Sequence, residues 1–378
     1  MKFIFSFSLV FLFLNTEAQS IKEYYDIGEY SKAIETFQSI ESPSTDDEII
    51  LAKTYAAKGM TLKCLKTYES AFSDTKADKF ITSKFQYAKI LQTQGRLKKA
   101  DSIYSRLLEV LPENAEFMYQ KGKIAEDFEE LGYHQFFLSA LLYDPTHIKA
   151  AHEASRYFME VDNLSMAKNI CLKTLELVPN TPRLINLMAQ IHYRKDDYAK
   201  SLAYIKQLEK LKSDLPKFIF EIKGNIYLKQ KLYKKAFKAY EMAYSKDNKD
   251  YNLCLKLGEI AIIIEDYDKA GRYLFLYERM RDTSMWEFNY LRGQLYLKRK
   301  EYRMAFYQFE RALKENISHE ASRYYRAIAA DNFAEDKAFV LDYYTNYIEF
   351  FEDEKDAKFV ELALRRETEI RRELFMKE

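Results

Sequence analysis

The residues able to do chemistry are few and scattered along this sequence. No GxGxxG, Walker-type phosphate loop, HExxH, CxxC or GxSxG pattern occurs in the 378 residues. The closest histidines, His147 and His152, would point about 140° apart on a helix, which does not favour a shared metal ion. His192 occupies an apolar-patterned position, where we expect a packed and hydrogen-bonded imidazole. His134 and His319 are isolated.

Acidic clusters could supply the paired carboxylates of an acid–base catalyst. The densest runs lie at 126–130 and 352–354. Acid–base catalysis needs one carboxyl group in an apolar pocket that raises its pKa, and these polar runs do not promise such a pocket. The sequence therefore predicts a protein that is not an enzyme, with no catalytic residue, no metal site and no cofactor. An enzyme on a helical framework is the least favoured alternative.

Three cysteines, Cys64, Cys171 and Cys254, lie roughly a hundred residues apart at apolar positions of predicted helices. An odd number leaves at least one thiol unpaired within the chain. We predict that all three are small buried hydrophobic residues and that no disulfide forms within the chain.

The first 18 residues have the pattern of a signal peptide. Lys2 precedes an apolar run at 3–14, and Thr16-Glu17-Ala18 offers a small-residue cleavage site. A membrane anchor is less favoured, because a helix over that run would span only about 18 Å of a hydrocarbon core of roughly 30 Å. We predict cleavage after Ala18, no stable membrane anchor afterwards, and an exported chain. Its expected location is periplasmic or extracellular (secreted), with a bacterial envelope favoured.

Composition limits the fold and the partners. Hydrophobic residues make up 48% of the chain, and only 9 Gly and 6 Pro are present, which favours an ordered helical protein. Because 59 basic residues balance 58 acidic ones, the net charge is only +1. The chain lacks the positive excess typical of nucleic-acid binding, so we expect no nucleic-acid partner.

Small residues recur along the chain in two series, and in the first of them the intervals are 33 to 36 residues. The first series consists of Ala52, Ala88, Gly122, Ser155, Ala189, Gly224, Gly258, Gly293 and Ala327. A second series runs in step with it: Ala33, Cys64, Ala100, Ala167, Ser201, Ala236, Ala270 and Ala305. The two series predict hairpins of two short antiparallel helices whose backbones approach at the small residues, with Gly28, Gly59 and Gly95 in the internal turns. Since one hairpin cannot bury its own apolar face, each needs neighbours.

This pattern resembles the tetratricopeptide repeat (TPR) family over essentially the whole chain after the signal peptide. The resemblance implies an all-α fold, a right-handed superhelical solenoid of TPR helix-turn-helix repeats. We assign residues 19–43 to a partial first repeat, 44–351 to an array of about nine repeats, and 352–378 to a C-terminal capping helix. Seven tyrosines in repeat positions are expected in the core: Tyr55, Tyr198, Tyr227, Tyr233, Tyr267, Tyr296 and Tyr302.

The resemblance also identifies the first-helix positions that face the concave side, one residue after the small position and three before it. In the N-terminal half these positions hold four cations and three aromatic or imidazole rings: Lys53, Lys89, Lys123, Arg156, Phe85, Tyr119 and His152. We predict that they bind a peptide carrying anionic side chains or a C-terminal carboxylate, with Phe85 and Tyr119 as apolar anchors. A solvated helix face is the alternative for the cations.

The predicted function is that of a non-enzymatic interaction scaffold or adaptor, which binds an extended segment of another protein in its concave groove. The alternative is a structural component of a cell-envelope secretion or surface-attachment assembly, which would use convex or edge surfaces. Apolar residues on the outer faces of the second helices would favour that alternative. The sequence indicates no oligomeric state.

Overall fold

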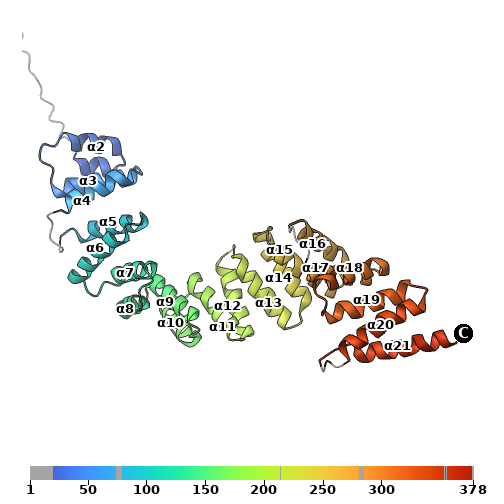
Figure 1. The fold of residues 1–378 in the computed structure, drawn as a ribbon. Helices are drawn as coiled ribbons and strands as arrows, with labels where there is room; N and C mark the ends of the chain where they lie inside the picture. The colour runs from blue at the N-terminus through green and yellow to red at the C-terminus, as the bar shows by residue number, and fades with distance from the viewer. Residues whose placement is uncertain are drawn as a thin grey trace, which may run out of the picture. The chain divides into compact units, whose positions relative to one another are not determined.

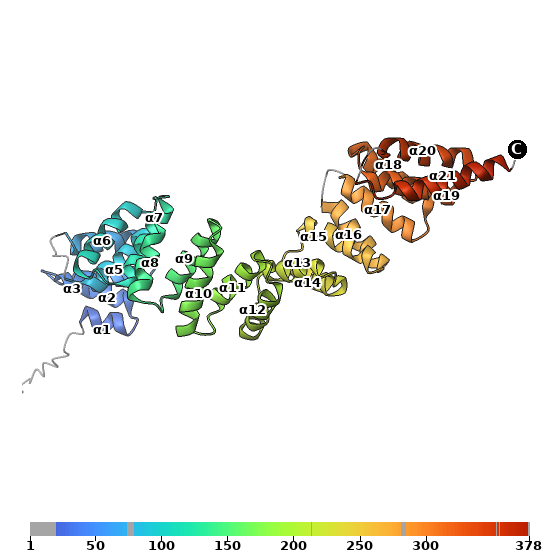
Figure 2. The same ribbon diagram turned by 90° about the horizontal axis from the view of Figure 1, so that it is seen from below.

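The computed structural model describes residues 20–73, 79–212, 214–280, 285–352, 354 and 356–376. It divides the chain into two compact units, Met1–Leu184 and Ile185–Glu378, called here the N-terminal unit and the C-terminal unit. Every regular element in the described residues is an α-helix, and strands are absent from them (Figures 1 and 2). The predicted signal peptide, 1–18, lies outside the described residues.

Successive helices of the N-terminal unit pair into hairpins, and the unit ends in the first turn of α11, Pro182–Arg194. Its helices are α1 Ile21–Asp26, α2 Tyr30–Gln38, α3 Thr45–Ala57, α4 Thr61–Ala71, α5 Ile81–Thr93, α6 Leu97–Val110, α7 Ala115–Asp127, α8 His134–Tyr143, α9 Ile148–Glu160 and α10 Leu164–Leu177. Odd-numbered helices are the first helices of their hairpins, and even-numbered helices are the second. The predicted helix-turn-helix repeat is confirmed in this unit.

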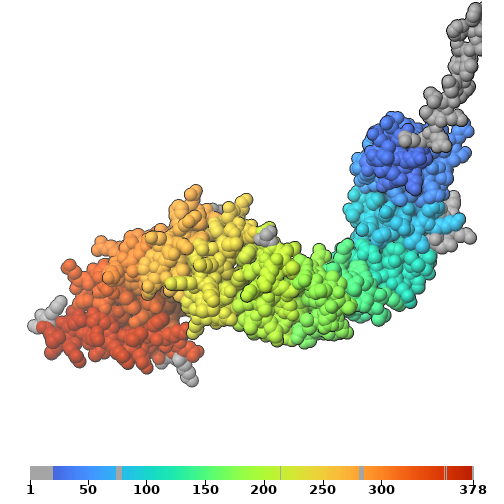
Figure 3. Space-filling view, turned by 180° about the vertical axis from the view of Figure 1, so that it is seen from behind, coloured from blue at the N-terminus to red at the C-terminus, as the bar shows by residue number. Residues whose placement is uncertain are grey.

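The C-terminal unit continues the same alternation and closes with a single helix. Its helices are α11 Pro182–Arg194, α12 Tyr198–Leu211, α13 Lys217–Lys229, α14 Tyr233–Lys246, α15 Tyr251–Ile263, α16 Tyr267–Met280, α17 Trp286–Lys298, α18 Tyr302–Glu315, α19 Glu320–Phe333, α20 Lys337–Phe351 and α21 Val360–Phe375. Within each unit the hairpins follow one another in chain order, so the colour changes gradually along each unit (Figure 3). The predicted all-α solenoid class is thus confirmed for each unit by itself.

Glycine lets the two helices of a hairpin approach closely, as the sequence predicts. A Cβ added to Gly293 on α17 would lie 2.6 Å from Cε1 of Phe309 on α18. The equivalent atom on Gly224 would lie 2.8 Å from the ring of Tyr240. Real Cβ atoms do not come so near, so an aromatic ring of the second helix rests on the bare backbone of the first. This contact fixes the spacing of the hairpin.

In every hairpin from α1–α2 to α17–α18, the internal turn keeps a residue in the left-handed region. Gly28, Gly59 and Gly95 have φ of +80°, +71° and +72°, which confirms their predicted role. Later turns use other residues at the same place: Glu129, Asp162, Asp196, Lys231, Glu265 and Lys300, with φ between 54° and 62°. Gly132 adds a second positive φ, +81°, in the longer turn between α7 and α8.

The seven tyrosines expected in the core are only half-buried, so that prediction is wrong in degree. All of them lie at the turn end of a hairpin, either in the last three residues of a first helix or at the first residue of a second helix. A ring there packs on the core with one face and meets solvent with the other. The fully buried tyrosines lie deeper in the second helices: Tyr68, Tyr104, Tyr240, Tyr277 and Tyr347.

Other buried groups agree with the sequence. Cys64, Cys171 and Cys254 are buried free thiols. His192 is buried, with Nδ1 3.2 Å from Oδ2 of Asp197 and its ring stacked on Tyr204. In the described residues, none of the helices combines the length and the apolar character that a membrane crossing requires.

Candidate functional site

The four predicted cations lie at equivalent positions of four successive first helices, α3, α5, α7 and α9, and are called here the cation row: Lys53, Lys89, Lys123 and Arg156. The structure divides this row in two. Side chains of α7 and α9 meet across the repeat boundary and form ion pairs. Lys53 and Lys89 have no ion-pair partner within the described part of the chain.

Lys123 and Arg156 belong to an ion cluster that joins α7 to α9. Glu126 pairs with both cations. Arg156 Nε also donates to Glu153 Oε2 at 3.0 Å, and its Nη1 donates to Glu160 Oε1 at 2.6 Å. Lys123 Nζ lies 4.0 Å from the same Glu153 Oε2. The cluster, defined as Lys123, Glu126, Glu153, Arg156 and Glu160, therefore holds three carboxylates against two cations and has no positive charge to spare.

Glu153 is the most strongly held carboxylate of this cluster. Burial alone would raise its pKa, but hydrogen bonds from His152 and Arg156, together with the charge of Lys123, outweigh burial and hold the pKa at about 2. The Nδ1 atom of His152 lies 3.2 Å from Glu153 Oε1, so the ring donates in the tautomer that carries its proton on Nδ1. His152 thus supports the cluster from α9 itself.

The two predicted apolar anchors differ in accessibility. Tyr119 is only 9% exposed and packs against Phe137 and His147, at ring distances of 5.9 and 5.2 Å. Burial raises its pKa to about 12. Phe85 is half-buried and packs on Phe117 at 5.1 Å, with Lys89 Nζ 5.5 Å from its ring centre. Phe85 therefore offers surface beside an exposed cation, whereas Tyr119 offers almost none.

Sequence reasoning missed the carboxylates of the ion cluster. Glu126 follows Lys123 by three residues, Glu153 precedes Arg156 by three, and Glu160 follows Arg156 by four. Residues at these spacings are neighbours on a helix surface, so the sequence did contain the signal.

A second set of cations ties successive repeats together on the other side of the first helices. Each of these cations stands one residue before a small position and pairs with a carboxylate on the second helix of the preceding repeat. The pairs are Lys121 with Asp101 (3.0 Å), Lys223 with Glu209 (2.6 Å), Arg292 with Glu278 (2.8 Å) and Arg326 with Glu310 (3.7 Å). This regular pairing supports the stacking of hairpins and was not predicted.

The described residues contain no group of three or more His, Cys, Asp or Glu side chains that could hold a metal ion. What the first helices offer is a row of charge with aromatic surface beside it. Together with the stacked hairpins, these features define a helical-repeat protein.

Comparisons with known proteins point to the same class. No family model matches the chain. Among curated proteins, the chain is 27% identical over 199 residues to the TPR repeat-containing protein MJ1428 of Methanocaldococcus jannaschii, covering 47% of this chain and 34% of that protein. It is 26% identical over 191 residues to the BBSome complex member BBS4 of Bos taurus, covering 49% and 36%. The chain thus spans about a third of the length of these relatives.

Among solved structures, the TPR protein YrrB, described as having an unusual peptide-binding site, superposes with a TM-score of 0.46 at 15% identity. The match covers 50% of this chain and 96% of that one. The name of the archaeal relative supports the tetratricopeptide resemblance that the repeat spacing indicates.

Proposed function

We propose that this chain is a non-enzymatic interaction scaffold that binds an extended acidic segment of another protein along α3 and α5. The observation that carries the proposal is the difference within the cation row. Lys53 and Lys89 stand in successive repeats without a carboxylate partner in the described residues, and Phe85 lies under Lys89. A segment with alternating acidic and apolar side chains fits this arrangement.

The same physical argument moves the proposed site away from α7 and α9. A partner carboxylate reaching Lys123 or Arg156 would have to displace Glu126 or Glu153, which already neutralise these cations. Leaving those carboxylates half-buried without a cation would cost free energy. A partner carboxylate that binds Lys53 or Lys89 displaces no carboxylate of the described residues. The proposed contact residues are therefore Lys53, Phe85 and Lys89.

An eight-residue peptide of alternating Asp and Leu, labelled with fluorescein, tests the proposal by fluorescence anisotropy with the full chain. Binding is expected to weaken as salt is added, because it depends on exposed charges. In the variant carrying Lys53→Glu and Lys89→Glu, the affinity should fall at least about tenfold, since two attractions become repulsions of roughly 0.5 to 1 kcal/mol each.

Lys98→Glu is the matched control, because Lys98 is an exposed lysine on the second helix α6. This variant should bind the peptide as the unchanged chain does, and circular dichroism should show equal helicity in all three proteins. Equal binding of a Lys-Leu counterpart, or undiminished binding by the double variant, would contradict the proposed site.

Export of the chain belongs to the proposal and rests on the pattern at residues 1–18. N-terminal sequencing of the chain recovered from a bacterial envelope fraction should begin at Gln19. An intact Met1 there would remove this part of the proposal.

An assembly role is the second candidate, and one observation favours it. Second helices of the C-terminal unit expose apolar side chains, among them Met242, Phe275 and Tyr307. If these residues mediate self-association, sedimentation velocity of the full chain should show a concentration-dependent oligomer. If the chain stays a monomer at all concentrations, self-association through these residues is excluded and the scaffold role is the remaining proposal.

A further inference from the structure

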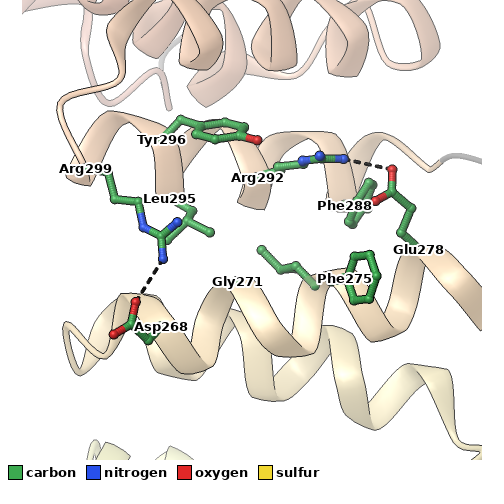
Figure 4. A pocket seen from close by; sticks show the side chains of 10 residues that line it. Asp268, Gly271, Phe275, Glu278, Phe288, Arg292, Leu295, Tyr296 and Arg299 are labelled. Carbon is green, nitrogen blue, oxygen red and sulfur yellow. Dashed lines mark hydrogen bonds and ion pairs between the residues drawn. The ribbon is translucent and has the colours of Figure 1, made fainter.

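A hollow of about 330 Å³ opens between α16 and α17 in the C-terminal unit (Figure 4). One wall comes from α16, with Gly271, Leu274 and Phe275, and the facing wall from α17, with Phe288 and Leu295. Leu274, Phe288 and Leu295 are buried side chains, so the floor of the hollow is apolar. Phe275 is 55% exposed and stands at the rim, facing Phe288 across the gap in Figure 4.

The hollow exists because Gly271 has no side chain at a position where neighbouring repeats carry phenylalanine. Gly271 follows the small residue Ala270, as Phe237 follows Ala236 on α14 and Phe306 follows Ala305 on α18. Phe237 packs on Tyr273 of the next second helix, at a ring distance of 5.9 Å. Phe306 packs on Phe333 of the next first helix, at 5.6 Å. On α16 the equivalent position is Gly271, so no phenylalanine ring from this position packs between α16 and α17.

Packing does not require glycine at this position. A Cβ on Gly271 would meet Nη2 of Arg299 at 3.5 Å and Cδ2 of Leu295 at 3.8 Å, both ordinary contacts. Its φ is not in the positive region, and glycine inside a helix costs about 1 kcal/mol relative to alanine. Gly271 therefore differs from Gly293, whose bare backbone supports a ring. What Gly271 provides is the open space itself.

Two guanidinium groups close the ends of the hollow. Arg292 Nη1 donates to Glu278 Oε1 at 2.8 Å. Arg299 Nη2 donates to the Tyr267 carbonyl at 2.9 Å and lies 3.3 Å from Oδ1 of Asp268, which is fully exposed. Each guanidinium has five N–H donors, so both groups keep donors for the backbone carbonyls of a bound segment.

We propose that this hollow binds a phenylalanine side chain from a partner protein. The ring takes the place that Phe237 and Phe306 fill from within the chain in the flanking repeats. It lies between Phe275 and Phe288, with Arg292 and Arg299 directed at the carbonyl groups on either side of it. Aromatic side chains that enter a pocket of the partner carry much of the affinity of an interface. The site lies on other helices than α3 and α5 and is independent of the acidic-segment proposal.

The probe for this site is N-acetyl-phenylalaninamide at millimolar concentration, observed by saturation-transfer NMR with the full chain. Ring protons of the probe should receive saturation, whereas N-acetyl-alaninamide should receive almost none. Gly271→Phe fills the hollow from within, so the signal should disappear while circular dichroism keeps its helical amplitude. Gly271→Ala is the matched control, because a single methyl leaves most of the space open and the signal should persist.

A second variant keeps the test informative if Gly271→Phe disturbs the fold. Phe275→Ala removes an exposed rim ring and should leave stability within about 0.5 kcal/mol of the unchanged chain. The dissociation constant of the probe should then rise about fivefold, the effect of losing one aromatic pair. The proposal is overturned if the probe receives no saturation from the unchanged chain. It is also overturned if the Gly271→Phe and Phe275→Ala variants both saturate the probe as strongly as the unchanged chain does.

Discussion

Phe309→Ala is expected to lower the free energy of unfolding of the C-terminal unit by about 4 kcal/mol. The Phe309 side chain is fully buried in α18, where its ring covers the backbone of Gly293 and stacks near Tyr325 at 6.0 Å. Removing the ring leaves a cavity that the glycine cannot fill, because it has no side chain to move. Few single changes in this unit should weaken it more.

Urea unfolding followed by fluorescence measures this effect locally. Trp286 is the only tryptophan of the chain and begins α17, the partner helix of α18. Tyr307→Ala is the control, since Tyr307 lies on the same helix but is 53% exposed, and its loss should change stability by at most about 0.5 kcal/mol. If both variants lowered the free energy of unfolding by the same amount, the ring of Phe309 would not stabilise the hairpin more than an exposed ring does.

A double-mutant cycle with Gly293→Ala and Phe309→Ala tests whether the effect of a side chain at position 293 depends on the ring of Phe309. Gly293→Ala alone should destabilise, because its Cβ would lie 2.6 Å from Phe309 and overpacking costs about 1 to 3 kcal/mol. In the Phe309→Ala background that clash is gone, and alanine should stabilise α17 by up to about 1 kcal/mol through helix propensity. Destabilisation by Gly293→Ala in both backgrounds would mean that its effect does not come from the ring.

The fold could be predicted because its determinants are local and repeated. Small residues such as Gly293 and Ala305 recur with the hairpin, and in the structure the ring of Phe309 covers Gly293 while Ala305 is fully buried. Burial depth was harder to predict. Tyr302 and Phe309 lie on the same face of one helix, but Tyr302 is at the turn end and half-exposed. Periodicity gives the direction of a side chain and not its distance from the end of the hairpin.

The candidate site could be predicted only in part, because charge depends on contacts between repeats. The sequence placed Lys89 and Lys123 in equivalent positions but could not show that Arg156 of the next repeat shares Glu126 with Lys123. The role of Gly271 was also hidden. It becomes visible only when α17 is seen to leave a hollow beside it.

The second large effect concerns the ion cluster and depends on pH. Glu153→Gln should lower stability at pH 7 by about 2 kcal/mol, because it removes the charge that holds Lys123 and Arg156 together. The Glu153 side chain is only 12% exposed, so solvent screens these contacts weakly. In the folded chain its pKa is about 2, against an ordinary value of 4.5. Since the folded pKa is the lower one, the ionised group stabilises fully above about pH 4.5 and loses this contribution as the pH falls towards 2.

Urea unfolding of the unchanged chain and of the Glu153→Gln variant, followed by circular dichroism, gives the free energy of unfolding of each at pH 7, 4.5 and 3. The difference between the two free energies should narrow by about half between pH 7 and pH 3. Glu160→Gln is the matched control. Glu160 bonds the same guanidinium, but its side chain is 53% exposed, so its loss should cost no more than about 0.5 kcal/mol. A Glu153→Gln difference that stays constant from pH 7 to pH 3 would mean that the ionised carboxylate does not stabilise the α7–α9 contact.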